Sequence, residues 1–186
     1  LPTAAAASIL LAAACPMARA NAASPVMSAR CSRSSASCGL LNCSAEGFAK
    51  AMDVSCHSFV RMAKLAAPLM TDGGTMFAMS YHGAAKVVPT YSVMGPVKAA
   101  LEACCRYLAY ELGGQGIRVH AISPGPLKTR AASGLKDFDL LLVEAAQRAP
   151  IGELVDIMDV GFACAYLATP FARRISGGTV YVDGGV

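Results

Sequence analysis

The sequence has 186 residues, of which 55% are hydrophobic, and its formal net charge is +4 at pH 7. This length suffices for one domain with an apolar core, and the charges form no basic stripe that would indicate nucleic-acid binding. The longest charge-free apolar run, around Ala4–Cys15, is too short to span a membrane, so we expect no transmembrane segment.

The eight cysteines include no CxxC pair and no histidine at a zinc-binding spacing, so we expect no metal site. Isolated thiols in an alanine-rich chain indicate small packing residues in a reducing compartment, here the cytoplasm.

Residues 1–43 differ in composition from residues 44–186. They are rich in Ala and Ser, contain no acidic residue and have no helical or strand period, so we interpret them as a separate low-complexity segment. A secretory signal would place its apolar stretch before the small residues "ARANAAS". An out-of-frame start is favoured instead, because Arg19 follows the apolar stretch and the chain begins with Leu1.

From Ser44 onward the pattern becomes regular. Ser44 is expected to cap a helix that runs to about Leu69, with Glu46 near the positive end of the helix dipole. One buried face is predicted from apolar residues at near-helical spacing, which are Phe48, Met52, Phe59, Met62, Ala66 and Leu69.

Strands and helices then alternate along the chain. The run "TMFAMS" (75–80) predicts a strand covered on both faces, and a second helix is expected over 91–112. A strand at 117–123 leads into the loop "PGPLKTR"; helices near 138–147 and 155–167 and a last strand at 178–185 follow. This alternation predicts a parallel α/β sheet, with ligands at the carboxyl ends of its strands.

Tyr91 and Lys98 stand about two helical turns apart, so one helix face would carry both. A lysine ammonium near a phenol lowers the pKa of the phenol and can also donate hydrogen bonds to a sugar hydroxyl. The alternative is that Tyr91 only packs in the core while Lys98 is solvated. What favours a site is the neighbourhood, because Tyr81 ends the preceding strand and the next strand leads into "SPGP".

The segment "SYHGAAKVVPTYSVMGPVKAALE", followed by "TRAASG", resembles the bacterial NADH-dependent enoyl-(acyl-carrier-protein) reductases of the short-chain dehydrogenase/reductase family. The resemblance covers about residues 39–186. It implies a Rossmann-like, doubly wound parallel sheet, here incomplete at the N-terminus. It also implies NADH as cofactor, acyl carrier protein as the substrate-bearing partner in fatty acid biosynthesis, and a homotetramer.

The same resemblance implies roles for individual residues. Tyr81, Tyr91 and Lys98 match the catalytic residues, and Lys98 also matches the lysine that contacts the nicotinamide ribose. Tyr81, Met94 and Phe138 match residues beside the substrate. The remaining cofactor contacts are implied at Gly125, Leu127, Lys128, Thr129, Arg130 and Ala131, with Thr129 as the main polar contact.

Two departures from the family qualify this interpretation. Carbonyl-reducing members use a serine twelve to fourteen residues before the tyrosine, whereas residues 77–79 here carry no hydroxyl, which favours reduction of a C=C bond. The glycine-rich turn that receives the pyrophosphate is also missing, since Gly39 is the only glycine before Gly47. We therefore expect weak or no activity, and a carbonyl reductase or a non-catalytic fragment remain alternatives.

The histidines carry weaker signals. His57 and His120 fall within a predicted helix and a predicted strand, where a structural role is expected. His82 stands next to Tyr81 and is a candidate neighbour of the site.

Overall fold

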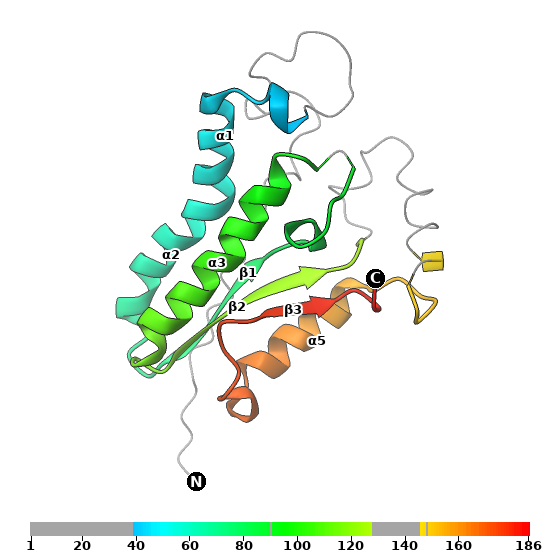
Figure 1. The fold of residues 1–186 in the computed structure, drawn as a ribbon. Helices are drawn as coiled ribbons and strands as arrows, with labels where there is room; N and C mark the ends of the chain where they lie inside the picture. Colours follow the sequence, from blue (N-terminus) through cyan, green and yellow to red (C-terminus); the bar gives the residue numbers. More distant parts are fainter. Residues whose placement is uncertain (1–38, 90, 128–145, 148) are drawn as a thin grey trace.

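The computed structural model describes residues 39–89, 91–127, 146–147 and 149–186 (Figure 1). Their centre is a parallel sheet of three strands in the order β1-β2-β3. The strands are β1 (Gly74–Met79), β2 (Ile117–Pro124) and β3 (Thr179–Val182). The prediction of a parallel α/β arrangement is confirmed.

Among the described residues, two α-helices precede the strands, and two lie between successive strands. They are α1 (Ala45–Met52), α2 (Ser58–Ala66), α3 (Met94–Gly113) and α5 (Ile157–Ala168). None of the helices in the part of the chain described is both long enough and apolar enough to cross a membrane.

The helix predicted over 44–69 is present, but it is interrupted. Ser44 caps it as expected, with its hydroxyl oxygen accepting a 3.0 Å hydrogen bond from the Gly47 N–H. A five-residue π turn, Asp53–His57, separates α1 from α2, and a 3-10 turn, Ala67–Leu69, follows α2. These turns change the number of residues per turn, so the helical period does not carry to the end of the segment. Leu69, predicted to be buried, is 75% exposed, and Met70 is buried instead.

Alternation of side chains across β1 and β2 builds two apolar layers. Met76 and Val119 pack with α2 and α3 on one face of the sheet. Phe77 and Ile122 face the other way and pack with α5. Figure 1 shows α3 and α5 on opposite sides of the strands. The apolar run of β1 is therefore explained by cover on both faces.

Element boundaries differ from the prediction by a few residues. Helix α3 begins at Met94 instead of residue 91, although the Tyr91 carbonyl already accepts a hydrogen bond of 2.9 Å from the Gly95 N–H. Strand β3 ends at Val182, before Gly184 and Gly185, which have positive φ angles. The helix expected near 138–147 lies outside the described residues except for 146 and 147.

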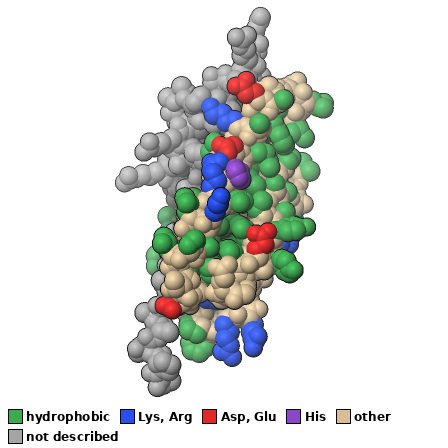
Figure 2. Space-filling model, turned by 90° about the vertical axis from the view of Figure 1, so that its left-hand side faces the viewer, with side chains coloured by type: hydrophobic (Ala, Val, Ile, Leu, Met, Phe, Trp, Pro, Cys, Tyr) green, Lys and Arg blue, Asp and Glu red, His purple; other side chains and the backbone are tan. Residues whose placement is uncertain are grey.

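The outer surface of α1 and α2 carries charges beside apolar side chains. Figure 2 shows basic, acidic and histidine side chains along this face, next to hydrophobic ones. Arg61 donates a hydrogen bond to Asp53, and the His57 ring lies 3.4 Å from the same carboxylate. These interactions hold the pKa of the Asp53 carboxyl below its usual value, through the Arg61 bond first and the His57 bond second.

Candidate active site

The candidate site lies where β1 and β2 end. The Ser80 N–H extends the pairing of the strands by donating a 2.7 Å hydrogen bond to the Ile122 carbonyl, and Tyr81 follows. Gly125 and Leu127 come directly after β2. The strand ends thus bring Tyr81 and the start of the "PGPLKTR" loop to the same edge of the sheet, as predicted for a ligand site in parallel sheets.

Two aromatic rings form the centre of this edge. The rings of Tyr81 and Tyr91 meet edge to face, with 5.0 Å between their centroids and 68° between their planes. The His82 ring stacks on Tyr81 at 4.5 Å. Burial raises the pKa of the Tyr81 hydroxyl, so this phenol remains protonated, and able to donate a hydrogen bond, over the neutral pH range.

Gly83 makes this packing possible. A Cβ atom at Gly83 would lie 2.7 Å from Cδ1 of Tyr91 and 3.3 Å from Cδ1 of Tyr81. Contacts this short are incompatible with the observed ring positions, so a larger residue would displace at least one phenol.

Lys98 lies beneath the end of β1. Its side chain is only 2% exposed, and Nζ donates a 2.7 Å hydrogen bond to the Met79 carbonyl, two residues before Tyr81. Burying an ammonium group is costly unless it is hydrogen-bonded, so a lysine at this position is held in a defined place. The alternative of a solvated Lys98 is wrong. Tyr91 precedes the first residue of α3 and Lys98 lies on the helix, so the expectation that one helix face carries both side chains stays a prediction.

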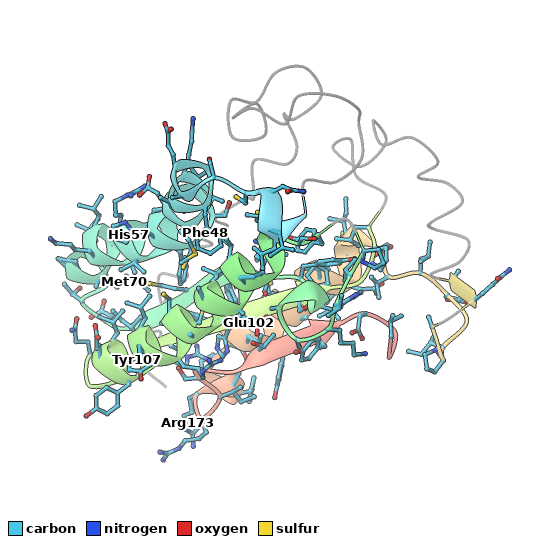
Figure 3. All side chains as sticks on the ribbon, turned by 45° about the horizontal axis from the view of Figure 1, so that its top comes forward. Phe48, His57, Met70, Glu102, Tyr107 and Arg173 are labelled. Carbon is cyan, nitrogen blue, oxygen red and sulfur yellow. The ribbon has the colours of Figure 1, made fainter. Side chains whose placement is uncertain are left out.

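Ser80, the hydroxyl nearest to the position where carbonyl-reducing relatives carry a serine, is engaged elsewhere. Its Oγ donates a 2.5 Å hydrogen bond to a carboxylate oxygen of Glu102 on α3. Figure 3 labels Glu102 on this helix. A hydroxyl that donates to a carboxylate is oriented by it, which removes Ser80 as a ready partner for a substrate carbonyl.

Three of the other candidate residues, Met94, Gly125 and Leu127, lie in the described part of the chain. Met94 packs against the apolar core on the α3 face of the sheet. Leu127 packs against the apolar cluster on the opposite face, which α5 covers. Gly125 is buried, and a Cβ there would approach Cα of Asp183 to 3.1 Å. The remaining candidates, Lys128, Thr129, Arg130, Ala131 and Phe138, lie outside the described residues.

A further polar group was not singled out from the sequence. The Ser123 hydroxyl, near the end of β2, is buried and has no hydrogen-bond partner among the residues described. Strand alternation turns Ser123 to the α3 side of the sheet, the side that carries Lys98. The signal that could have found it is its place in "SPGP", directly before the loop.

The histidines take three different positions. His57 lies on the surface near Asp53, and His82 contacts Tyr81. His120 is fully buried and stacks on Phe77 at 5.7 Å, and both of its ring nitrogens are without a hydrogen-bond partner in the described part of the chain. Burial, with a smaller contribution from the nearby Arg118, lowers the pKa of His120 to about 4.

Within the same described ranges, His, Cys, Asp and Glu form no group of three that could hold a metal ion.

A parallel sheet with helices on both faces and the candidate side chains at the carboxyl ends of its strands is characteristic of a Rossmann-type fold, which is incomplete here. The chain belongs to the enoyl-(acyl carrier protein) reductase family, whose family model matches residues 17–186.

Curated relatives support this assignment. The chain is 46% identical over 145 residues to the NADH-dependent enoyl-(acyl-carrier-protein) reductase 1 of Rhizobium meliloti (strain 1021), a match that covers 78% of this chain and 53% of the relative. It is also 46% identical over 140 residues to the NADH-dependent enzyme of Escherichia coli (strain K12), covering 75% of this chain and 53% of the relative. The chain therefore spans about half the length of the curated relatives it matches.

Solved structures agree with this fold. The enoyl-acyl carrier protein reductase of Bacillus cereus, in complex with NADP+ and indole naphthyridinone, matches with a TM-score of 0.77 and 39% identity, covering 80% of this chain and 58% of that one. The NADH-type reductase of Aquifex aeolicus VF5 matches with a TM-score of 0.73 and 44% identity, covering 79% of this chain and 57% of that one.

Proposed function

We propose that this chain carries the catalytic portion of an NADH-dependent enoyl-(acyl-carrier-protein) reductase of fatty acid biosynthesis. The observation that carries the proposal is the pairing of two phenols in edge-to-face contact with a buried lysine at one edge of a parallel sheet. Tyr81, Tyr91 and Lys98 are the proposed catalytic residues.

The residues at this edge fit the nicotinamide end of NADH. Lys98 offers ammonium protons on the α3 side, and the buried Ser123 hydroxyl on the same side has unused hydrogen-bonding capacity among the described residues. Gly125, Leu127 and the loop residues Lys128 to Ala131 are proposed as further contacts. When bound, NADH would supply the hydride that is added to the β-carbon of a trans-2-enoyl thioester.

The residues of the chain would act on the charge that this addition creates. Negative charge develops on the thioester oxygen as an enolate, and the Tyr91 hydroxyl is proposed to donate a hydrogen bond to it. Lys98 would hold the nicotinamide ribose and favour the partial negative charge on the Tyr91 oxygen. Tyr81, which packs against Tyr91 and stays protonated at neutral pH, would position the thioester or deliver the proton. Met94 and Phe138 are proposed to contact the acyl chain.

Reduction of a carbonyl is the second candidate. It is disfavoured because residues 77–79 carry no hydroxyl and because the Ser80 hydroxyl donates to Glu102.

The composition of residues 1–43 bears on the expected activity. Residues 1–43 contain one glycine, Gly39, so a loop that cradles a pyrophosphate with closely spaced glycines is absent from that sequence. We infer that residues 44–186 form the C-terminal portion of one short-chain dehydrogenase/reductase domain. We further propose a cytoplasmic homotetramer that acts on enoyl groups borne by acyl carrier protein, with activity well below that of a full-length relative.

Binding and turnover of the purified chain test this proposal. Calorimetric titration with NADH should give weak binding. With NADH present, a crotonyl thioester should be reduced faster than an acetoacetyl thioester, although far more slowly than by an intact relative. Faster reduction of the acetoacetyl substrate would support the carbonyl-reductase alternative, and complete absence of NADH binding would support a non-catalytic fragment.

A chimera distinguishes two explanations of low activity: that the proposed reaction is wrong, or that the chain lacks the loop that binds the pyrophosphate of NADH. Residues 39–186 would replace the corresponding portion of an intact enoyl reductase, so that the relative supplies the glycine-rich loop. The chimera should oxidise NADH with the crotonyl thioester, and Lys98→Met should raise the apparent KM for NADH. A folded chimera that binds NADH and does not reduce the enoyl thioester would overturn the assignment.

A further inference from the structure

Two thiols face each other between the helices that cover one side of the sheet. Cys56 lies in the π turn, Cys104 lies on α3, and their Sγ atoms are 3.7 Å apart. Both thiols are free. Within the described ranges no other pair of cysteine sulfurs is recorded in contact, and Cys164 packs on the opposite face of the sheet, under α5.

The π turn accounts for the position of Cys56. Ala51, Cys56 and Phe59 are all buried in the core, and the five-residue step from Ala51 to Cys56 matches the wider turn. In a regular α helix, a residue five positions on would be rotated well away from the buried face. The insertion therefore turns Cys56 toward α3.

We propose that Cys56 and Cys104 are a redox modification site, which a peroxide converts into a disulfide that ties the α1–α2 segment to α3. A disulfide has about 2.05 Å between its sulfur atoms, so the two atoms need to approach by less than about 2 Å. The π turn and α3 already pack together. Rotation of the two cysteine side chains, with a small backbone shift, can therefore bring the sulfur atoms to bonding distance.

The difference in exposure between the two thiols indicates which of them the peroxide oxidises first. Cys104 is partly exposed, whereas Cys56 is buried, and this burial chiefly raises the pKa of the Cys56 thiol to about 12. The Cys104 thiolate attacks one peroxide oxygen, the O–O bond breaks, and a sulfenic acid and hydroxide (or alkoxide) form. The Cys56 sulfur then attacks the Cys104 sulfur, the S–O bond breaks, and the departing oxygen takes the Cys56 proton to leave as water. Two thiols lose two electrons, and the peroxide gains them.

The cross-link would act close to the candidate active site. Lys98 lies six residues before Cys104 on α3, and its charge opposes the rise in the pKa of Cys56. The disulfide would also close a loop over a sequence separation of 48 residues. Loops of this length restrict the unfolded chain strongly when they are closed. Oxidation should therefore raise the midpoint of thermal unfolding by roughly 10 °C.

Peptide mapping tests the proposal on the purified chain. Reduced protein is treated with hydrogen peroxide under native conditions, remaining thiols are alkylated, and the unreduced digest is analysed by mass spectrometry. A peptide pair joining Cys56 to Cys104, about 2 Da lighter than the two thiol peptides together, is expected as the main product. Cys56→Ser and Cys104→Ser should each abolish it, and the matched controls Cys105→Ser and Cys164→Ser should retain it.

Two comparisons make the outcome decisive. The same oxidation in concentrated urea should lower the yield of the Cys56–Cys104 peptide at least tenfold relative to its native yield, because the pairing depends on the fold. The oxidised wild type should gain thermal stability, whereas peroxide-treated Cys104→Ser should not. Recovery of Cys56 and Cys104 as alkylated thiols, or equal cross-linking in urea and in native buffer, would overturn the proposal.

Discussion

Tyr91 and Tyr107 differ only in their surroundings, which makes them a matched pair for mutagenesis. Tyr91 contacts Tyr81 at the edge of the sheet, whereas Tyr107 projects from α3 and is 71% exposed (Figure 3). In the chimera, Tyr91→Phe should lower kcat for the crotonyl thioester by about 10²-fold or more, because one donor to the developing enolate is lost. Tyr107→Phe should leave kcat unchanged. Steady-state kinetics with equal kcat values for both variants would exclude the proposed role of Tyr91.

His120 should make stability depend on pH. Burial favours the neutral ring and lowers the pKa of His120 from its usual value of 6.5 to about 4 in the folded protein. The folded state therefore excludes a proton that the unfolded chain binds, and the stabilising contribution is complete above pH 6.5 and lost as the pH falls toward 4. The slope that this one group adds is at most about 1.4 kcal/mol per pH unit.

Urea denaturation between pH 7 and pH 4 measures this contribution. The free energy of unfolding should fall more steeply with decreasing pH for the wild type than for His120→Leu, which has no titrating ring. Parallel curves for the two proteins would contradict the inferred pKa.

At the scale of elements, α5 depends on its N-terminal cap. The Asp156 carboxylate accepts a 2.9 Å hydrogen bond from the Asp159 N–H, and the Asp159 carboxylate accepts one of 2.8 Å from the Asp156 N–H. Asp156→Ala should reduce the free energy of unfolding by about 1 kcal/mol. Glu111→Ala also removes one exposed carboxylate, but from the C-terminal end of α3, and should cause no loss. Chemical denaturation of both variants distinguishes loss of the cap from a general loss of charge.

Elements could be predicted from the sequence wherever a local signal agrees with the packing. Ser44 capped its helix, and β1 was recognised as covered on both faces because its apolar run does not alternate. The π turn could not be predicted, since its cost is offset by tertiary contacts of Cys56 and Phe59 that no local pattern encodes. The exposure of Leu69 follows from the same interruption.

The candidate site could be predicted only in part from the sequence. Spacing alone favoured a packed Tyr91 with a solvated Lys98, and the resemblance to a family supplied the residue roles. Burial of Lys98 depends on the hydrogen bond to the Met79 carbonyl, which joins residues 19 positions apart. Ser123 was missed because a serine inside an apolar strand has no distinctive spacing.

For the whole molecule, the exposed face of α5 predicts self-association. Met158, Phe162 and Tyr166 recur every four residues, and each is more than half exposed, so they form one apolar stripe. Exposed apolar surface of this kind marks interaction sites, in agreement with the proposed homotetramer. Phe162→Glu should shift the mass measured by light scattering toward smaller species.

A charge control accompanies this variant. Arg173→Glu alters an exposed residue beyond the stripe and should leave the mass unchanged. Identical masses for Phe162→Glu and the wild type would show that the stripe does not hold copies together.

The close packing of tyrosine rings on Gly83 has a consequence for protein engineering. The backbone of Gly83 does not require the conformational freedom of glycine, since its φ is not among the positive values found in the described residues. The restriction comes from the rings of Tyr91 and, less closely, Tyr81, which approach the position of the missing side chain. A library that randomises this codon should therefore yield functional clones almost exclusively with glycine. A smaller residue at position 91 would make room for a side chain, but it would also remove the proposed donor.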